Sequence, residues 1–136
     1  MSKIYHLDTN ICVAYLRGRN LDLRKKVDAA GSDNIKLSSL VKGELLFGAY
    51  KSGRVEENLK QTYDFCEPFD IIPFDNFVLD TYGKIRAALE LKGQKIGAND
   101  TMIAAIALAH NATLVTNNIK EFSRIEGLLL EDWTQK

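Results

Sequence analysis

Two patterns of apolar residues alternate along the chain. Short continuous apolar runs predict strands covered on both faces, whereas stretches with an apolar residue every three or four positions predict helices. In the helix predicted over residues 55–66, for example, Val55, Leu59, Tyr63 and Cys66 fall on one face. The predicted strands are residues 4–7, 35–38, 69–74, 112–116 and 128–130. The predicted helices are residues 10–16, 21–30, 40–51, 55–66, 76–91 and 100–109.

The order of these elements predicts an α/β protein. Strands separated by helices form βαβ units, so we expect a three-layer α/β/α arrangement around a mostly parallel sheet of about five strands. The helix over residues 100–109 is apolar on nearly every side, which predicts that it is buried. With 136 residues and no linker or repeat, the chain is expected to form a single domain over residues 1–136. Ligands of such sheets bind beyond the carboxyl ends of the strands.

The charge balance narrows the classes of function. Eighteen basic residues offset eighteen acidic ones, whereas a protein that coats nucleic acid by bulk electrostatics carries a cationic excess. One local basic segment fits either phosphate contacts or a solvated helix face; it comprises Arg17, Arg19, Arg24, Lys25 and Lys26. No apolar run is long enough for a membrane span, and the N-terminus lacks the apolar stretch of a signal peptide. We therefore expect a cytoplasmic protein with no membrane association.

Acidic and amide side chains stand near the ends of the predicted strands. Asp8 follows the first strand, Glu44 lies in the helix after the second, and Asp100 opens the buried helix. Each has an ordinary structural interpretation: Asp8 as a helix N-cap, Glu44 as a solvated carboxylate, and Asp100 as a charge at the positive end of a helix dipole. Asn118, after the fourth strand, suits an Asx-turn. Taken together, the four residues are expected to converge at one edge of the sheet.

Three carboxylates gathered at one sheet edge predict a metal site. Each would be costly beside apolar segments if unpaired, and each would raise the pKa of the others. A hard divalent cation removes both problems, and oxygen ligands without His or Cys favour Mg²⁺ or Mn²⁺ over zinc. Because Mg²⁺ commonly binds substrate phosphates as well, the site indicates phosphoryl chemistry. A histidine-type ribonuclease is disfavoured, since His6 in a strand and His110 at a helix end give no sign of meeting.

Four segments of the chain resemble the PIN-domain toxins of bacterial VapBC toxin–antitoxin modules. They are YHLDTNICVAYL, SSLVKGELLFGA, GQKIGANDTMIAAIALAHNATLVTNNIKEFSRI and the closing LLLEDW. The resemblance runs nearly end to end and implies a PIN-like fold. It also implies a ribonuclease that cuts single-stranded or loop RNA with Mg²⁺, for which Mn²⁺ can substitute. Such a toxin is neutralised by a VapB-type antitoxin, whose C-terminal tail covers the active site.

The resemblance also assigns roles to particular residues. The acidic positions of the family match Asp8, Glu44 and Asp100, which it implies are catalytic metal ligands. The fourth catalytic position is often Asp in the family and is Asn118 here, so the resemblance makes Asn118 a catalytic residue but puts a second, tightly held metal in doubt. The supporting polar positions match Thr9, Asn10, Ser39 and Thr116.

The partners expected of this chain come from the same resemblance. The ending EFSRIEGLLLEDW, with GQKIGAND, resembles the subgroup that cuts initiator tRNA in the anticodon stem-loop, and thereby inhibits translation. The family implies a homodimer and a toxin–antitoxin hetero-oligomer, with operator DNA contacted only through the antitoxin. The basic segment from Arg17 to Lys26 is the candidate RNA-binding surface.

Two other functions are weighed against this interpretation. A Mg²⁺-dependent phosphohydrolase of the aspartyl-phosphate type usually carries a second Asp two residues after its nucleophile, but Asn10 stands there in this chain. A non-catalytic module that binds RNA or a peptide has no need to hold three carboxylates together. Cleavage of RNA with Mg²⁺ and its loss with EDTA would separate the nuclease from both alternatives.

Overall fold

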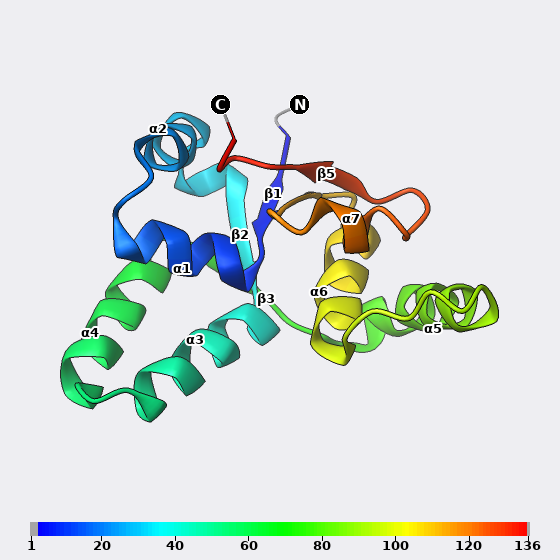
Figure 1. Cartoon of the computed structure of the whole chain (residues 1–136), viewed down its shortest axis with the longest axis horizontal. Helices are drawn as coiled ribbons and strands as arrows, with labels where there is room; N and C mark the ends of the chain where they lie inside the picture. The colour runs from blue at the N-terminus through cyan, green and yellow to red at the C-terminus, as the bar shows by residue number, and fades with distance from the viewer. Residues whose placement is uncertain (1–2, 136) are drawn as a thin grey trace.

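A computed structural model of the chain describes residues 3–135 and contains a five-stranded sheet surrounded by helices (Figure 1). The strands are β1 (Tyr5–Leu7), β2 (Ile35–Ser38), β3 (Asp70–Ile72), β4 (Thr113–Val115) and β5 (Leu129–Glu131). The helices are α1 (Thr9–Arg17), α2 (Leu21–Ala30), α3 (Ser39–Lys51), α4 (Val55–Cys66), α5 (Asn76–Leu91), α6 (Ala98–Ala109) and α7 (Ile119–Phe122). A short 3₁₀ helix, η1 (Ser32–Asn34), precedes β2.

The strand order creates a switch point between β1 and β4. The sheet runs β3-β2-β1-β4-β5, and every neighbouring pair is parallel. The chain moves outward from β1 to β3 and then crosses back to place β4 on the other side of β1. In Figure 1, α1 and α2 lie on one side of the sheet, and α6 and α7 lie on the other. The predicted α/β fold with a parallel sheet is confirmed, and such switch points are where open α/β sheets bind ligands.

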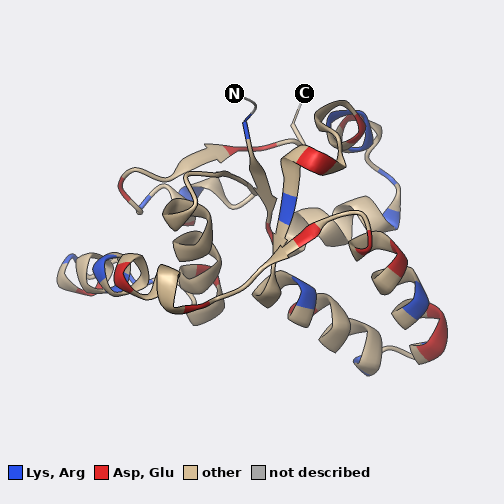
Figure 2. Ribbon diagram, turned by 180° about the vertical axis from the view of Figure 1, so that it is seen from behind, with Lys and Arg blue, Asp and Glu red and all other residues tan. Residues whose placement is uncertain are grey.

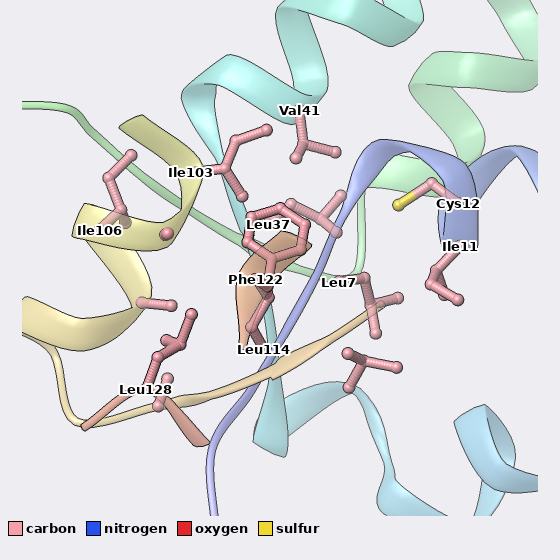
Figure 3. Packing of buried hydrophobic residues seen from close by; sticks show 14 of the residues in the cluster. Leu7, Ile11, Cys12, Leu37, Val41, Ile103, Ile106, Leu114, Phe122 and Leu128 are labelled. Atoms are coloured by element: carbon pink, nitrogen blue, oxygen red, sulfur yellow. The ribbon is translucent and has the colours of Figure 1, made fainter. Parts of the chain in front are cut away.

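The core confirms the expected burial of the α6 segment. Ile103 and Ile106 are almost fully buried, and the alanines between them allow α6 to pack closely against its neighbours. Figure 3 shows these two isoleucines near Leu37 of β2 and Leu114 of β4. Phe122 of α7 also enters this core and is only 1% exposed. Helix α6 therefore places its first turn, which contains Asp100, against the body of the domain.

Two elements are present that the sequence patterns did not predict. Both η1 and α7 are single turns, too short to show an apolar repeat of their own. Other predicted boundaries shift by one or two residues; for example, α6 begins at Ala98 rather than at Asp100. Within residues 3–135, none of the helices combines the length and the hydropathy needed to cross a membrane.

Candidate active site

Asp8 lies where β1 ends, directly beside the end of β4. Its backbone N–H donates to the carbonyl of Val115 at 3.0 Å. One carboxylate oxygen accepts from the backbone N–H of Ile11 at 2.9 Å, and the other accepts from the Thr116 hydroxyl at 2.5 Å. Asp8 therefore caps α1, as its structural interpretation predicted, and also bridges β1 to β4. Its side chain is fixed by these two hydrogen bonds beside the β1–β4 switch point of the sheet.

The turn after β4 connects Asp8 to a carboxylate that the sequence analysis missed. The Thr116 hydroxyl oxygen accepts from the backbone N–H of Asn118 at 2.9 Å. The Asn118 side-chain amide donates to the carboxylate of Glu121 at 2.5 Å. A continuous chain of hydrogen bonds thus runs from Asp8 to Glu121. One sequence feature could have pointed to Glu121. It lies three residues after Asn118, and this spacing places the two residues on one side of a helical turn.

The carboxylates of this region influence one another electrostatically. Burial raises the pKa of Asp8 to about 6, against the lowering effect of its hydrogen bonds from Thr116 and Ile11. The negative charges of Asp100 and Glu44 contribute to this rise as smaller causes. Burial also raises the pKa of Asp100, and Glu121 and then Glu44 add to that rise. The three predicted acidic residues and Glu121 therefore share one electrostatic environment.

No basic side chain offsets this acidic group within the described residues. Of the ion pairs within 4.0 Å found in residues 3–135, none involves Asp8, Glu44, Asp100 or Glu121. Asp8 is 4% exposed, and a buried carboxylate without a counter-charge is costly. This unfavourable free energy is consistent with a site that binds a cation.

The donor set suits a hydrated hard cation rather than a closed metal cage. In the part of the chain from residue 3 to residue 135, no three His, Cys, Asp or Glu side chains are close enough to ligate one ion together. Mg²⁺, however, usually retains several waters and binds one or two carboxylates directly. The carboxylates around Asp8 supply oxygen donors only, which fits Mg²⁺ or Mn²⁺.

The supporting polar residues fall into different surroundings. Thr116 holds Asp8, whereas the Thr9 hydroxyl oxygen is buried without a hydrogen-bond partner in residues 3–135. Asn10 is exposed. At the start of α3, the capping residue is Ser38, whose hydroxyl accepts from the backbone N–H of Val41 at 3.1 Å. Ser39 is the first residue of α3, and five residues later this helix carries Glu44.

The five basic residues of the candidate RNA-binding segment do not form one surface. Arg17, Arg19 and Lys25 line a single cleft where α1 meets α2. Arg24 instead lies over the ring of Tyr15, with its guanidinium carbon 4.9 Å from the ring centre. Lys26 donates to the backbone carbonyl of Gln135 at 3.2 Å. Adjacent helical residues point about 100° apart, so residues 24, 25 and 26 cannot face the same ligand.

The expectation that the two histidines do not meet is wrong. The ring centres of His6 and His110 lie 6.3 Å apart, because the end of α6 packs over β1. Burial, and next the proximity of His110, lower the pKa of His6 to about 4. His6 is 2% exposed and therefore stays neutral and out of reach of a substrate. The pair does not make a histidine-type ribonuclease site.

Comparison with known proteins identifies the family. A model of the PIN domain matches residues 5–128. The chain belongs to the PIN-domain family. Among proteins with assigned functions, this PIN domain is similar to "Ribonuclease VapC2" of Rickettsia felis, with 44% identity over 96% of this chain and 98% of that protein. It is also 35% identical to "tRNA(fMet)-specific endonuclease VapC" of Shigella flexneri, over 96% of this chain and 98% of that protein.

Solved structures of VapC-type relatives share this arrangement of strands and helices. The PIN domain superimposes on VapBC2 from Rickettsia felis bound to a promoter DNA fragment, with a TM-score of 0.90 and 43% identity over 96% of this chain and 98% of that one. DNA-bound VapBC from Salmonella typhimurium gives a TM-score of 0.91 and 34% identity over 98% of this chain and 99% of that one. The predicted VapC-type resemblance is therefore confirmed.

Proposed function

We propose that this chain is the toxin of a VapBC-type module, a single PIN domain that hydrolyses RNA with the help of Mg²⁺ or Mn²⁺. The observation that carries this proposal is the group of mutually repelling carboxylates around Asp8, which lies at the β1–β4 switch point and has no basic counterpart. The relatives named as ribonucleases support the same activity. Translation would be inhibited by cleavage of RNA in the cytoplasm.

Four acidic side chains would surround the hydrated cation in this proposal, and one or two of them would bind it directly. Asp8, Glu44 and Asp100 are the expected ligands, and we add Glu121 because its charge acts on Asp100. Asn118 serves as a positioning residue, since its amide donates to Glu121 instead of presenting a negative ligand. The missing fourth aspartate is thus replaced by a glutamate three residues later.

The chain's own residues prepare this site for phosphodiester hydrolysis. A bound divalent cation supplies an activated water and offsets the charge that grows on phosphorus during attack. Thr116 and the Ile11 backbone N–H fix the two oxygens of Asp8, so this carboxylate needs little reorganisation. Asn118 restrains Glu121 in the same way. Hydrolysis by water leaves a 5′-phosphate and a 3′-hydroxyl, so 2′,3′-cyclic phosphate ends would contradict the mechanism.

The metal dependence is tested by two measurements. Purified protein should cut RNA with Mg²⁺ and lose the activity with EDTA; cleavage that survives EDTA would exclude the cation. Asp100→Asn should weaken Mn²⁺ binding, measured by calorimetry, as well as cleavage. The matched control is Asp80→Asn, at an exposed aspartate of α5 that pairs only with Lys84.

The substrate we propose is single-stranded or loop RNA, and in particular the anticodon stem-loop of initiator tRNA. The similarity to a relative named as specific for tRNA(fMet) supports this choice. Initiator tRNA and elongator methionine tRNA form a matched pair, because both carry the same anticodon. Preferential cleavage of the initiator is expected. Equal cleavage of the two tRNAs would contradict the specificity for initiator tRNA and leave only a general ribonuclease activity.

We also propose a VapB-type antitoxin as the partner of this chain, in a toxin–antitoxin hetero-oligomer built on a toxin homodimer. The relatives from Rickettsia felis and Salmonella typhimurium support it, because both were solved as VapBC complexes with DNA. Operator DNA would be contacted only through the antitoxin. Co-expression with a VapB-type antitoxin should restore growth and yield a complex of both proteins. A toxin that remains active in that complex would contradict the assignment.

The two alternative functions are less compatible with the site. An aspartyl-phosphate enzyme usually carries a second Asp two residues after its nucleophile, but Asn10 stands at that position. A non-catalytic binding module has no need to hold a buried, uncompensated Asp8 beside three further carboxylates. The nuclease needs this arrangement, because the carboxylates around Asp8 are the groups that receive the cation.

A further inference from the structure

A basic cleft is joined to the acidic site through one shared side chain. A cavity of about 410 Å³ between α1, α3 and α4 is lined by both Glu44 and Arg17. A second cavity, of about 710 Å³, lies where α1 meets α2 and is lined by Arg17, Arg19 and Lys25. Because Arg17 forms part of both walls, the basic cleft and the cavity that contains Glu44 adjoin at this residue.

The cations of the basic cleft are available to a ligand. Arg17, Arg19 and Lys25 are exposed, and within residues 3–135 none of them pairs with a carboxylate at 4.0 Å or less. Other cations of this net-neutral chain are paired, such as Lys60 with Asp64 at 2.7 Å. Figure 2 shows the basic segments on α2 and at the end of α1 that precedes it. Of the charged side chains that line the cleft, three are basic and one, Asp22, is acidic, so the cleft carries a net positive charge.

The backbone around the basic cleft is held in a fixed shape. Helix α1 ends at Gly18, whose φ of 69° is in the left-handed region, and the Arg24 side chain packs against it. The Asn20 amide donates to the Thr134 carbonyl at 3.3 Å, so the C-terminal segment braces the start of α2. Trp133, next to Thr134, is buried against the ring of Tyr5. The cations thus project from a rigid corner, which reduces the entropy lost on binding.

We propose that the cleft formed by Arg17, Arg19 and Lys25 binds the phosphate backbone of the RNA strand on one side of the bond that is cut. The proposal rests on the ribonuclease activity proposed above. An RNA strand carries one negative charge at every nucleotide, and guanidinium groups bind phosphate oxygens in pairs. Contacts to phosphate position a strand without reading its bases. The cleft should therefore set the affinity for RNA and leave the position of cleavage to other contacts.

The test measures RNA binding separately from cleavage. A labelled single-stranded RNA oligonucleotide is titrated at several salt concentrations, with every variant placed in the cleavage-deficient Asp8→Asn background. Removing the three cleft cations together (Arg17→Ala, Arg19→Ala, Lys25→Ala) should reduce the slope of log affinity against log salt by about 2, since each phosphate contact on a single strand contributes about 0.7. At low salt the affinity should fall at least about tenfold.

Two further variants separate the cleft from general charge and from packing. The matched control removes three cations elsewhere (Lys60→Ala, Lys84→Ala, Lys92→Ala) and should leave the slope unchanged. The double variant Arg17→Lys, Arg19→Lys keeps both positive charges and should retain the salt slope. If the guanidinium groups had only a structural role, lysines would not restore the slope. In the cleft variant with Asp8 intact, mapping of the cut site should give the wild-type position. Cleavage kinetics of the same variant should give a raised KM.

Several outcomes would overturn the proposal. Equal slopes for the cleft variant and the control would make these residues a solvated surface. A variant that keeps its RNA affinity but loses affinity for the antitoxin would show that the cleft receives an acidic protein segment. If the wild-type protein cuts no RNA while the cleft variant loses salt-dependent binding, the proposed catalytic function fails and the binding cleft stands.

Discussion

Replacing Asp8 with asparagine should stabilise the protein in the absence of divalent cations, although Asp8 is central to the candidate site. Burial raises the pKa of Asp8 to about 6 from its ordinary 3.8. Keeping the carboxylate ionised near pH 7 then costs about 3 kcal/mol. Asparagine has no charge and still caps α1. The asparagine amide group can no longer accept the hydrogen bond from the Thr116 hydroxyl, and this loss cancels about 1 kcal/mol of the gain. We expect a net gain of about 2 kcal/mol, or roughly 7 °C in melting temperature.

The gain from Asp8→Asn should depend on pH with a definite sign. Because the folded pKa of Asp8 exceeds the unfolded value, the neutral carboxyl stabilises the wild-type fold below about pH 4, and this contribution is lost as the pH rises through about 6. The variant's advantage should therefore be largest above about pH 7 and shrink toward about pH 4.

Urea denaturation in EDTA across this pH range measures the effect. Asp80→Asn is the control, because Asp80 is exposed and its ion pair with Lys84 should contribute less than about 1 kcal/mol. Adding Mn²⁺ should stabilise the wild type more than Asp8→Asn. The reasoning is refuted if Asp8→Asn is no more stable than the wild type near neutral pH, or if the difference between them does not change with pH.

Three further changes probe the site and its support. Thr116→Val removes the hydroxyl that holds Asp8 and should lower the free energy of unfolding by about 1–3 kcal/mol in urea denaturation; an unchanged value would show that this contact contributes nothing. Phe122→Ala should cost about 3–5 kcal/mol in the same assay, whereas Phe47→Ala, at a side chain that is 65% exposed, should cost far less. Glu121→Gln and Asn118→Ala should each weaken Mn²⁺ binding in calorimetry, and the double variant should bind no more weakly than Glu121→Gln alone. Fully additive losses would mean that Asn118 acts independently of Glu121.

The sequence patterns predicted the elements that carry their own periodic signal. The strands β1, β2 and β4 are short segments in which most residues are buried, and the apolar stretch of α6 reflects its burial in the core. Because parallel strands end at a common edge, the sequence placed Asp8 and Thr116 at the same edge of the sheet. That β1 and β4 are direct neighbours, which brings the two side chains within hydrogen-bond distance, is shown only by the structure.

Contacts that depend on how elements pack could not be predicted in this way. Helix α7 is one turn long, and Phe122 anchors it through the core rather than through a local pattern. His6 and His110 meet only because the end of α6 lies over β1. The basic segment had the right composition, but the helical rotation between neighbouring residues divides it into groups with different partners.

The pairing of Asn118 with Glu121 explains how this site loses one expected aspartate without losing an acidic group. Residues three apart on a helical turn face the same side, so Glu121 can serve the edge of the sheet that an aspartate at position 118 would serve. An aspartate at that position would bring a second negative charge close to Glu121, and each carboxylate would raise the pKa of the other. Asparagine removes this repulsion and donates a hydrogen bond instead. The amide at position 118 and the carboxylate at position 121 therefore depend on each other, and a change at either position should be tolerated only with a compensating change at the other.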